Sequence, residues 1–336
     1  MSFLFKGVDF FPHDTRWKII ERRYIFIGIS WALAVLAAVL LMTRGLNYGV
    51  DFKGGSLIEV QSKGAIDIGD LRSRLDRLGI GDVQVQAIAQ AVGSGSGALI
   101  RVAQQVPTKD LSEEKVQAAA NDKVKGALGA DLEVRRIEIV GPTVSSELKR
   151  TGVIAVVASM FGILLYVWFR FEWQFAVAAI LALSHDVFIT VGMFSLLWYE
   201  FDLSVVAAIL TLAGYSINDT VVVFDRIREN LRRYKRMPLI ELLNLSINET
   251  LSRTVLTSVT TALAVLALYI FGTAVIHGFS FAMLFGIIIG TYSSIFVAAP
   301  FLLLFGVKRE WGGTAAAAPA KSDAAGKPRR ENVPTK

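Results

Sequence analysis

The sequence contains no cysteine and little charge. Because thiols are absent, disulfides, iron–sulfur clusters and thiolate chemistry are excluded. Charged residues make up 19% of the 336 residues, whereas hydrophobic residues make up 53%. A soluble chain normally carries more charge and less apolar surface than this. The composition therefore favours an integral membrane protein before any motif is considered.

The common signatures of enzymes and of metal sites are also missing. The chain has no Ser/His/Asp set, no zinc-ligand spacing and no phosphate-binding glycine loop, and Gly54-Gly55 lacks the flanking pattern of a nucleotide motif. His185-Asp186 alone supplies too few ligands for an intramembrane metalloprotease. We therefore expect no enzymatic activity, no bound metal and no organic cofactor.

The net charge of +6 does not predict nucleic-acid binding, because no basic face is interleaved with aromatic residues. The basic residues lie instead at the ends of apolar segments. Six such segments approach or exceed the roughly 20 residues that cross a bilayer. They are residues 24–43, 153–169, 175–198, 203–224, 255–271 and 279–307. The fold class predicted is a multi-pass α-helical membrane protein with six transmembrane helices.

Two features qualify the first and the last of these segments. The first follows basic residues, as a signal peptide does, but no small-residue cleavage site follows it, so we expect it to stay attached as a helix. Pro300 lies in the last, unusually long segment. Since proline disrupts helical hydrogen bonding, this segment is predicted to tilt, kink or end early.

Lysine and arginine are absent from two short loops, residues 199–202 and 272–278. The N-terminal segment 1–23, the turn at Arg170, the segment 225–253 and the exit at Lys308-Arg309 are all basic. Because basic loops stay in the cytoplasm, both chain ends are predicted to be cytoplasmic and residues 44–151 extracytoplasmic. Residues 308–336, rich in alanine, proline and charge, are predicted to form a disordered cytoplasmic tail.

The long loop, residues 44–151, has the pattern of a small α+β domain. Strands are predicted at residues 56–61, 83–89, 98–103 and 132–140, and helices at residues 67–78 and 109–128. The order β-α-β-β-α-β is that of a ferredoxin-like fold. No cluster in this domain has catalytic character, so contact with another protein is the expected role.

Polar residues interrupt the fourth apolar segment at Asn218-Asp219-Thr220. Tyr215 lies four residues before Asp219 and Thr211 four residues before Tyr215, so these side chains share one face of a helix. At ~1.5 Å per residue, Asp219 lies about 24 Å from the start of the segment. A charge at the bilayer centre costs about 2.5–3.5 kcal/mol and usually serves a function. Asp219 is therefore predicted to be functional.

Arg253 precedes the fifth segment and lies on the same helical face as Thr257 and two later threonines. The spacing allows this face to meet the polar face of the fourth segment, and the long arginine side chain can reach toward Asp219. Arg253 could equally be a positive-inside anchor, and the threonines could simply pack helices.

In the third segment, His185-Asp186 could relay a proton, since histidine has a suitable intrinsic pKa. A hydrogen bond between packed helices explains the pair equally well, so both interpretations stay open.

Four motifs resemble the SecF family, whose members are the smaller partners of SecD in bacterial protein export. They are Asp51-Phe52-Lys53-Gly54-Gly55-Ser56 after the first segment, Ser184-His185-Asp186-Val187 in the third, GYSINDTVVVFDRIREN at residues 214–230 and NETLSRTVLTS at residues 248–258. The resemblance covers nearly the whole chain except the C-terminal tail, and the fourth-segment motif is long and specific.

The resemblance implies a bacterial inner-membrane protein that pairs with SecD in a twelve-helix unit of the resistance–nodulation–division superfamily. It implies use of the proton gradient to assist late steps of export through SecYEG, with SecA and the preprotein as indirect partners. The family's essential aspartate and arginine correspond to Asp219 and Arg253. Two alternatives remain: a half-transporter for lipids or small molecules, and a non-transporting scaffold. The basic segment 226–236 could contact SecY, anionic membrane lipid or neither.

Overall fold

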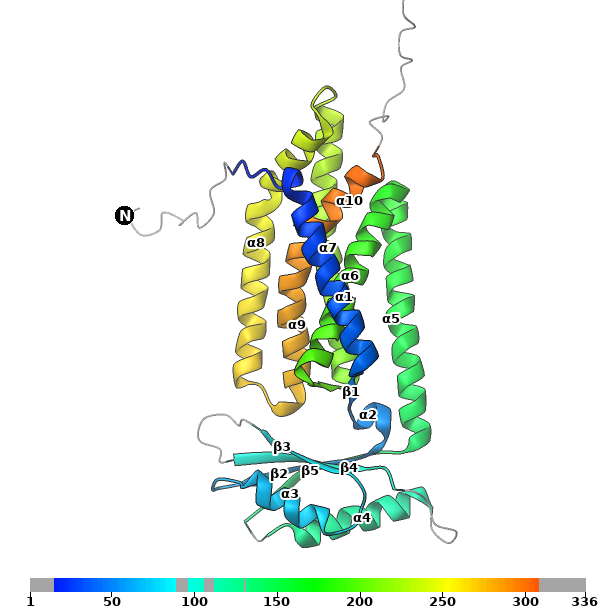
Figure 1. Ribbon diagram of the computed structural model, residues 1–336, viewed down its shortest axis with the longest axis vertical. Coiled ribbons are helices and arrows are strands. Elements are labelled where there is room, and N and C mark those ends of the chain that lie inside the picture. Colours follow the sequence, from blue (N-terminus) through cyan, green and yellow to red (C-terminus); the bar gives the residue numbers. More distant parts are fainter. Residues whose placement is uncertain (1–14, 89–95, 106–111, 130, 308–336) are drawn as a thin grey trace, which may run out of the picture.

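The computed structural model describes residues 15–88, 96–105, 112–129 and 131–307. The predicted tail, residues 308–336, lies outside this part of the chain. The described residues form a bundle of long helices with a small α+β domain across one end, as Figure 1 shows. The first described residues and the last helical turn lie at the opposite end of the bundle.

Six helical segments in the described part of the chain are long and apolar enough to cross a membrane, which confirms the predicted fold class. Five are the single helices α1 (Arg23–Thr43), α5 (Pro142–Arg170), α6 (Trp173–Leu197), α7 (Leu203–Arg233) and α8 (Leu239–Phe271). The sixth consists of α9 (Ala274–Ser293), a π-helix (Ser294–Ala298) and α10 (Ala299–Leu304).

The sixth segment changes helix type close to Pro300, where the sequence predicted a tilt, a kink or an early end. Pro300 stands in the first turn of α10, directly after the π-helix. Its nitrogen carries no hydrogen and cannot donate to the carbonyl of Phe296, so the regular α-helical ladder cannot run through this point. Short π segments of this kind are often found at functional sites.

Helices α7 and α8 extend well beyond the apolar runs at residues 203–224 and 255–271. Much of the basic segment 225–253 is helical, because α7 continues to Arg233 and α8 begins at Leu239. The two ends are joined by Glu249, which accepts hydrogen bonds from Arg226 at 2.6 Å and from Asn230 at 2.7 Å. The hydrogen bonds of Glu249 therefore hold α7 and α8 together in the polar parts that lie beyond their apolar runs.

The interior of the bundle lies between α6, α7 and the sixth segment. About half of each of these spans is buried within the chain, against 11–17% for the spans of α1, α5 and α8. Helix α1 crosses α6 so closely that a Cβ at Gly192 would collide with Ala37. The outer helices expose long apolar faces, as expected where lipid or another membrane protein covers them.

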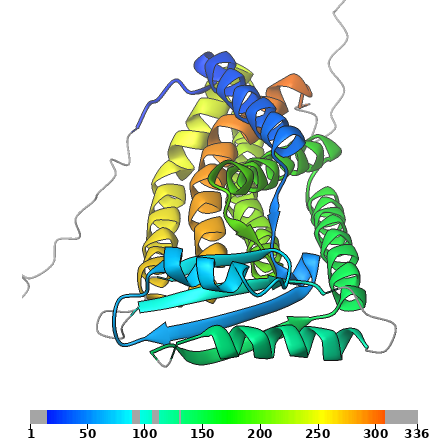
Figure 2. The same ribbon diagram turned by 60° about the horizontal axis from the view of Figure 1, so that its bottom comes forward.

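The α+β domain contains β2 (Gly55–Ser62), α3 (Ile68–Asp76), β3 (Val83–Ile88), β4 (Ser96–Ala103), α4 (Glu113–Ala127) and β5 (Glu133–Val140). Its four strands form an antiparallel sheet in the order β3-β4-β2-β5. This is the predicted ferredoxin-like arrangement. Figures 1 and 2 show α3 and α4 on the face of the sheet that points away from the bundle.

Alternation along the strands separates the two faces of the sheet. Ile58 and Ile100 point toward the helices and are fully buried with Leu71 and Leu75 of α3. Arg101, one residue after Ile100, points to the other face and forms an ion pair with Glu200 of the bundle. One face of the sheet is therefore the domain core, and the other meets the membrane helices.

Short elements connect the domain to the bundle. The two-residue strand β1 (Asn47–Tyr48) pairs in parallel with β6 (Glu200–Phe201), which lies between α6 and α7. The one-turn helix α2 (Val50–Lys53) follows β1 and leads directly into β2. These contacts place the start of the domain against the start of α7.

Candidate functional site: carboxylates between the membrane helices

Asp219 lies inside the bundle on α7, with only 9% of its surface exposed. Its Oδ1 accepts a hydrogen bond of 2.7 Å from the Thr254 hydroxyl on α8. Its Oδ2 is buried and has no hydrogen-bond partner among the described residues. A buried carboxylate oxygen without a donor is costly. Asp219 is therefore a half-satisfied carboxyl group at a point where two spanning helices meet.

Arg253 precedes Thr254 but lies on the exposed side of α8. Among the described residues, no ion pair joins its guanidinium to Asp219. Thr257 and Thr260 are exposed as well, and their hydroxyls donate to carbonyls of their own helix. The expected contact of this threonine face with α7 is not seen at Thr257 and Thr260, because both side chains are exposed at the surface of the bundle.

The predicted polar face of α7 is divided in the structure. Thr211 and Asn218 are exposed, whereas Tyr215 is half-buried and donates a weak hydrogen bond of 3.4 Å to Ser258 on α8. Ser258 in turn shares a hydrogen bond of 2.6 Å with Thr291 on α9. Tyr215 thus belongs to a polar bridge across three helices, while Thr211 and Asn218 face outward.

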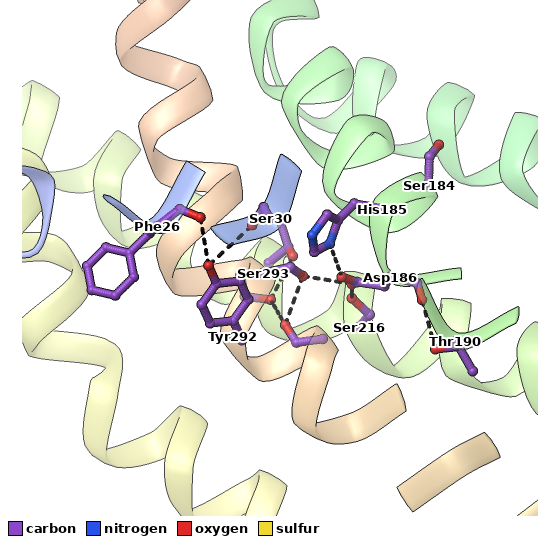
Figure 3. A network of polar contacts seen from close by, with 12 residues as sticks. Phe26, Ser30, Ser184, His185, Asp186, Thr190, Ser216, Tyr292 and Ser293 are labelled. Carbon is purple, nitrogen blue, oxygen red and sulfur yellow. Dashed lines mark hydrogen bonds and ion pairs between the residues drawn. The ribbon is translucent and has the colours of Figure 1, made fainter. Parts of the chain in front are cut away.

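Asp186 on α6 is completely buried, and both of its oxygens have partners. Its Oδ2 accepts hydrogen bonds of 2.7 Å from Ser216 on α7 and from Ser293 on α9, as Figure 3 shows. Its Oδ1 lies 3.1 Å from Nδ1 of His185. Asp186 therefore joins three helices through one carboxyl group and contrasts with the half-satisfied Asp219.

His185 extends the network toward α1. Its ring stacks on Tyr292 with centroids 6.5 Å apart, and its Nε2 is buried without a partner among the described residues. The Tyr292 hydroxyl donates to the carbonyl of Phe26 at 2.8 Å and lies 3.2 Å from the Ser30 hydroxyl (Figure 3). This geometry is that of a hydrogen-bonded network that packs α1, α6 and α9 together.

Two adjacent serines connect the surroundings of the two carboxylates. Ser293, the last residue of α9, binds Asp186, whereas Ser294, the first residue of the π-helix, shares a hydrogen bond of 2.9 Å with Thr220. Thr220 follows Asp219 directly on α7. A shift of the π-helix would therefore disturb the environments of Asp186 and Asp219 together.

The glycine motif after the first span lies at the junction of domain and bundle, far from the carboxylates. Gly54 and Gly55 have φ angles of +76° and +117°, values that other residues rarely adopt. A Cβ at Gly55 would also collide with the carbonyl of Val102. Before the glycines, Asp51 accepts a hydrogen bond from Leu203, the first residue of α7, and the Phe52 ring packs against Phe201 in the loop before α7. The motif is thus a tight turn that brings Asp51 to the bundle.

Sequence reasoning missed several polar residues of the site. The missed residues share a buried or half-buried position between helices and a hydrogen bond across them; they are Ser216, Thr254, Ser258, Thr291, Tyr292, Ser293 and Ser294. The run of residues 291–294, Thr-Tyr-Ser-Ser in an otherwise apolar span, is the signal that could have found four of them. In the part of the chain that the structure describes, no group of three or more His, Cys, Asp or Glu residues could hold a metal ion.

The described residues contain six helices long and apolar enough to span a membrane, a ferredoxin-like domain after the first of them and carboxylates buried in the bundle. Together these features define a polytopic membrane protein of the transport type. Two family models match the chain. "Protein export membrane protein SecD/SecF, C-terminal" covers residues 120–308, and "SecD/SecF GG Motif" covers residues 39–66.

Curated relatives named SecF match over most of their length. SecF of Ketogulonicigenium vulgare is 47% identical over 93% of this chain and 94% of its own, and SecF of Cereibacter sphaeroides is 43% identical over 89% and 92%. SecDF of Brucella abortus is 44% identical over 88% of this chain but only 38% of its own length. The crystal structure of SecDF from Thermus thermophilus superposes with a TM-score of 0.76 at 38% identity, covering 88% of this chain and 39% of that chain.

The chain belongs to the SecD/SecF family of protein export membrane proteins, and within it to the SecF subunits of the protein translocase. It is a component of membrane transport rather than an enzyme, and it assists protein export. The chain spans about two-fifths of the length of the SecDF proteins that it matches.

Proposed function

We propose that the protein pairs with SecD and uses the proton gradient to assist late steps of export through SecYEG. SecA and the preprotein would be indirect partners, and the membrane the bacterial inner membrane. Both chain ends would lie in the cytoplasm and the α+β domain in the periplasm, in keeping with the basic loops at the end of the bundle opposite the domain.

The observation that carries the proposal is the unequal state of the two buried carboxylates. Both oxygens of Asp186 have hydrogen-bond partners, whereas Oδ2 of Asp219 has none among the described residues. Burial without a donor opposes the charged form of a carboxyl group, and a nearby cation favours it. A cation that moves toward or away from Asp219 would therefore change its proton occupancy.

Arg253 is the cation placed to make that change. It lies on α8 beside Thr254, which already contacts Asp219, but its side chain is exposed. In the proposed cycle, rocking of α8 against α7 brings Arg253 toward Asp219 and releases the proton, and the reverse motion allows uptake from the other side. One charge crossing 100 mV supplies about 2.3 kcal/mol, enough to bias such a two-state motion.

Association with SecD is supported by two observations. Relatives named SecDF match this chain over only about two-fifths of their length, and the remainder of such a chain is available for the SecD part. The exposed sides of α7 and α8 also carry Thr211, Asn218, Arg253 and Thr257 within apolar surroundings. Polar groups at the surface of a spanning helix are better accommodated by another protein than by lipid.

The test is export of a secreted reporter in cells depleted of their own SecD and SecF. The cells receive cognate SecD with the wild type, Asp219→Asn or the control Asp225→Asn, which removes a charge at the polar end of the same helix. We expect rescue by the wild type and the control but not by Asp219→Asn, at equal membrane levels. The amide keeps the shape of the carboxyl group but cannot ionise.

The other outcomes discriminate between the alternatives. Rescue by Asp219→Asn would remove proton exchange from the mechanism and favour a scaffold within the export machinery. Failure of all three proteins, despite normal membrane insertion and copurification with SecD, would contradict the export role in these cells. Transport of lipids or small molecules by the reconstituted pair would then be measured.

A further inference from the structure

The first turn of α7 is bound by a residue of the segment that leads into the α+β domain. Oδ2 of Asp51, on α2, accepts a hydrogen bond of 2.8 Å from the backbone nitrogen of Leu203, the first residue of α7. Oδ1 of Asp202 accepts from the nitrogen of Val205 at 2.9 Å. The N-terminus of a helix presents unpaired N–H groups and a partial positive charge, so two carboxylates stabilise it well. One of these caps is local, and the other comes from about 150 residues earlier in the chain.

Further contacts hold the same junction. Asn47 and Tyr48 of β1 face Glu200 and Phe201 of β6 across the parallel bridge, and the nitrogen of Gly49 donates to the carbonyl of Phe201 at 2.9 Å. The Phe52 and Phe201 rings pack with their centroids 6.0 Å apart, and Arg101 of β4 pairs with Glu200. The loop before α7 is thus bound by backbone, aromatic and charged contacts.

The two glycines make this junction short. They turn the chain at the end of α2, so that β2 begins only four residues after Asp51. β2 is a central strand of the sheet and is paired on both sides, with β4 and β5. Asp51 is therefore connected to the middle of the domain and not to a loose edge of it.

From these contacts we infer that Asp51 is a positioning residue that clamps the α+β domain to the first turn of α7. Because α7 is one continuous helix from Leu203 through Asp219 to Arg233, the clamp makes the domain move with the helix that carries the buried carboxyl group. A change at Asp219 would then reach the far side of the membrane as motion of the domain. The inference rests on the proposed function for its readout, which is export.

The absence of cysteine from the chain allows a direct test. Asn47→Cys and Glu200→Cys place two thiols on residues that face each other across a parallel bridge, where neighbouring strands are about 4.8 Å apart. That spacing lies within the Cα range of disulfides. A disulfide at this pair would restore the clamp covalently in a protein that lacks Asp51.

The experiment measures proton-gradient-dependent preprotein uptake by inverted membrane vesicles that contain SecYEG, SecA, SecD and the full chain. Asp51→Ala is expected to lower uptake to the level of vesicles without the chain. In the triple variant Asp51→Ala, Asn47→Cys, Glu200→Cys, uptake should be low under a membrane-permeant reductant and return under a membrane-permeant oxidant. The matched control is Asp67→Ala, which removes the side-chain cap of α3 within the same domain and should leave uptake unchanged.

Three results would overturn the clamp. They are wild-type uptake by Asp51→Ala, equal loss in Asp67→Ala, or no recovery on oxidation although the disulfide has formed. Protease resistance of the domain in each variant separates loosening from unfolding, and Asp51→Asn, which keeps one acceptor oxygen, should retain part of the uptake. Asp219→Asn is measured in parallel. Normal uptake by Asp219→Asn would contradict the proposed proton cycle. Recovery of the triple variant on oxidation would still support the clamp in that case.

Discussion

Thr254 on α8 donates a hydrogen bond of 2.7 Å to Oδ1 of Asp219 on α7, and Oδ2 of that carboxyl group has no hydrogen-bond partner among the described residues. We predict that Thr254→Val, which keeps the shape of the side chain but removes the donor, lowers stability by about 1–3 kcal/mol, because a buried acceptor is left unpaired. Thr254→Val should also lower export, because α8 then loses its hydrogen bond to Asp219. Thermal unfolding in detergent and the reporter assay measure the two effects.

Thr254→Ser is the matched control for that change, because serine keeps the hydroxyl group. It should retain export and most of the stability. Equal loss in both variants would show that packing by the threonine methyl group, and not the hydrogen bond to Asp219, is what the site requires.

The two serines that donate to Oδ2 of Asp186 are predicted to act as a unit. Ser216→Ala and Ser293→Ala should each lower stability by about 1–3 kcal/mol, since each removes a donor from a fully buried carboxyl group. Because both contact one oxygen atom, the double variant should depart from additivity by roughly 0.5–3 kcal/mol. Ser280→Ala is the control, because its buried hydroxyl has no described partner and its loss should be nearly neutral. Strict additivity would contradict a shared site.

Glu200, outside the membrane spans, is predicted to give stability a specific dependence on pH. Burial raises the pKa of its carboxyl group above the ordinary 4.5, and Arg101 only partly opposes this. The folded protein therefore binds this proton at a higher pH than the unfolded chain does. The contribution of Glu200 to stability must then fall as pH rises from 4.5 through the raised pKa, by about 1.4 kcal/mol for each unit of difference.

Thermal unfolding over a pH series measures this slope. Glu200→Gln should flatten the curve in that range, whereas Glu133→Gln, at the exposed start of β5, should leave it unchanged. A rise of stability with pH that disappears in Glu200→Gln would show that the ion pair with Arg101 outweighs the burial of Glu200.

The helices and the domain topology could be predicted because their signals are local. Apolar run length defines the spans, and alternating apolar residues define strands such as β2 and β4. Pro300 predicted the interruption of the last span for the same reason, since proline acts on its own helix. These signals do not predict how far a helix continues beyond its apolar run, as the extensions of α7 and α8 show.

The site was predicted only in part, because the face that a helix turns inward is decided by tertiary packing. Asp219 was found from its cost in a membrane, but its partner is Thr254 and not the threonine face that begins at Thr257. Arg253 lies on the exposed side, and its role beside Asp219 stays a prediction. A single buried serine such as Ser293 carries no sequence signal of its own until the helix opposite it is known.

One feature of the α+β domain determines how its movements can be observed. The last strand, β5, ends at Val140, and α5 begins at Pro142, so only Gly141 separates the sheet from a spanning helix. Because no flexible linker separates β5 from α5, the domain cannot turn freely while α5 stays still. The orientation of the domain therefore follows the tilt of α5. A spectroscopic label on the water-exposed surface of α4 would report rearrangements inside the membrane without a probe in any apolar span.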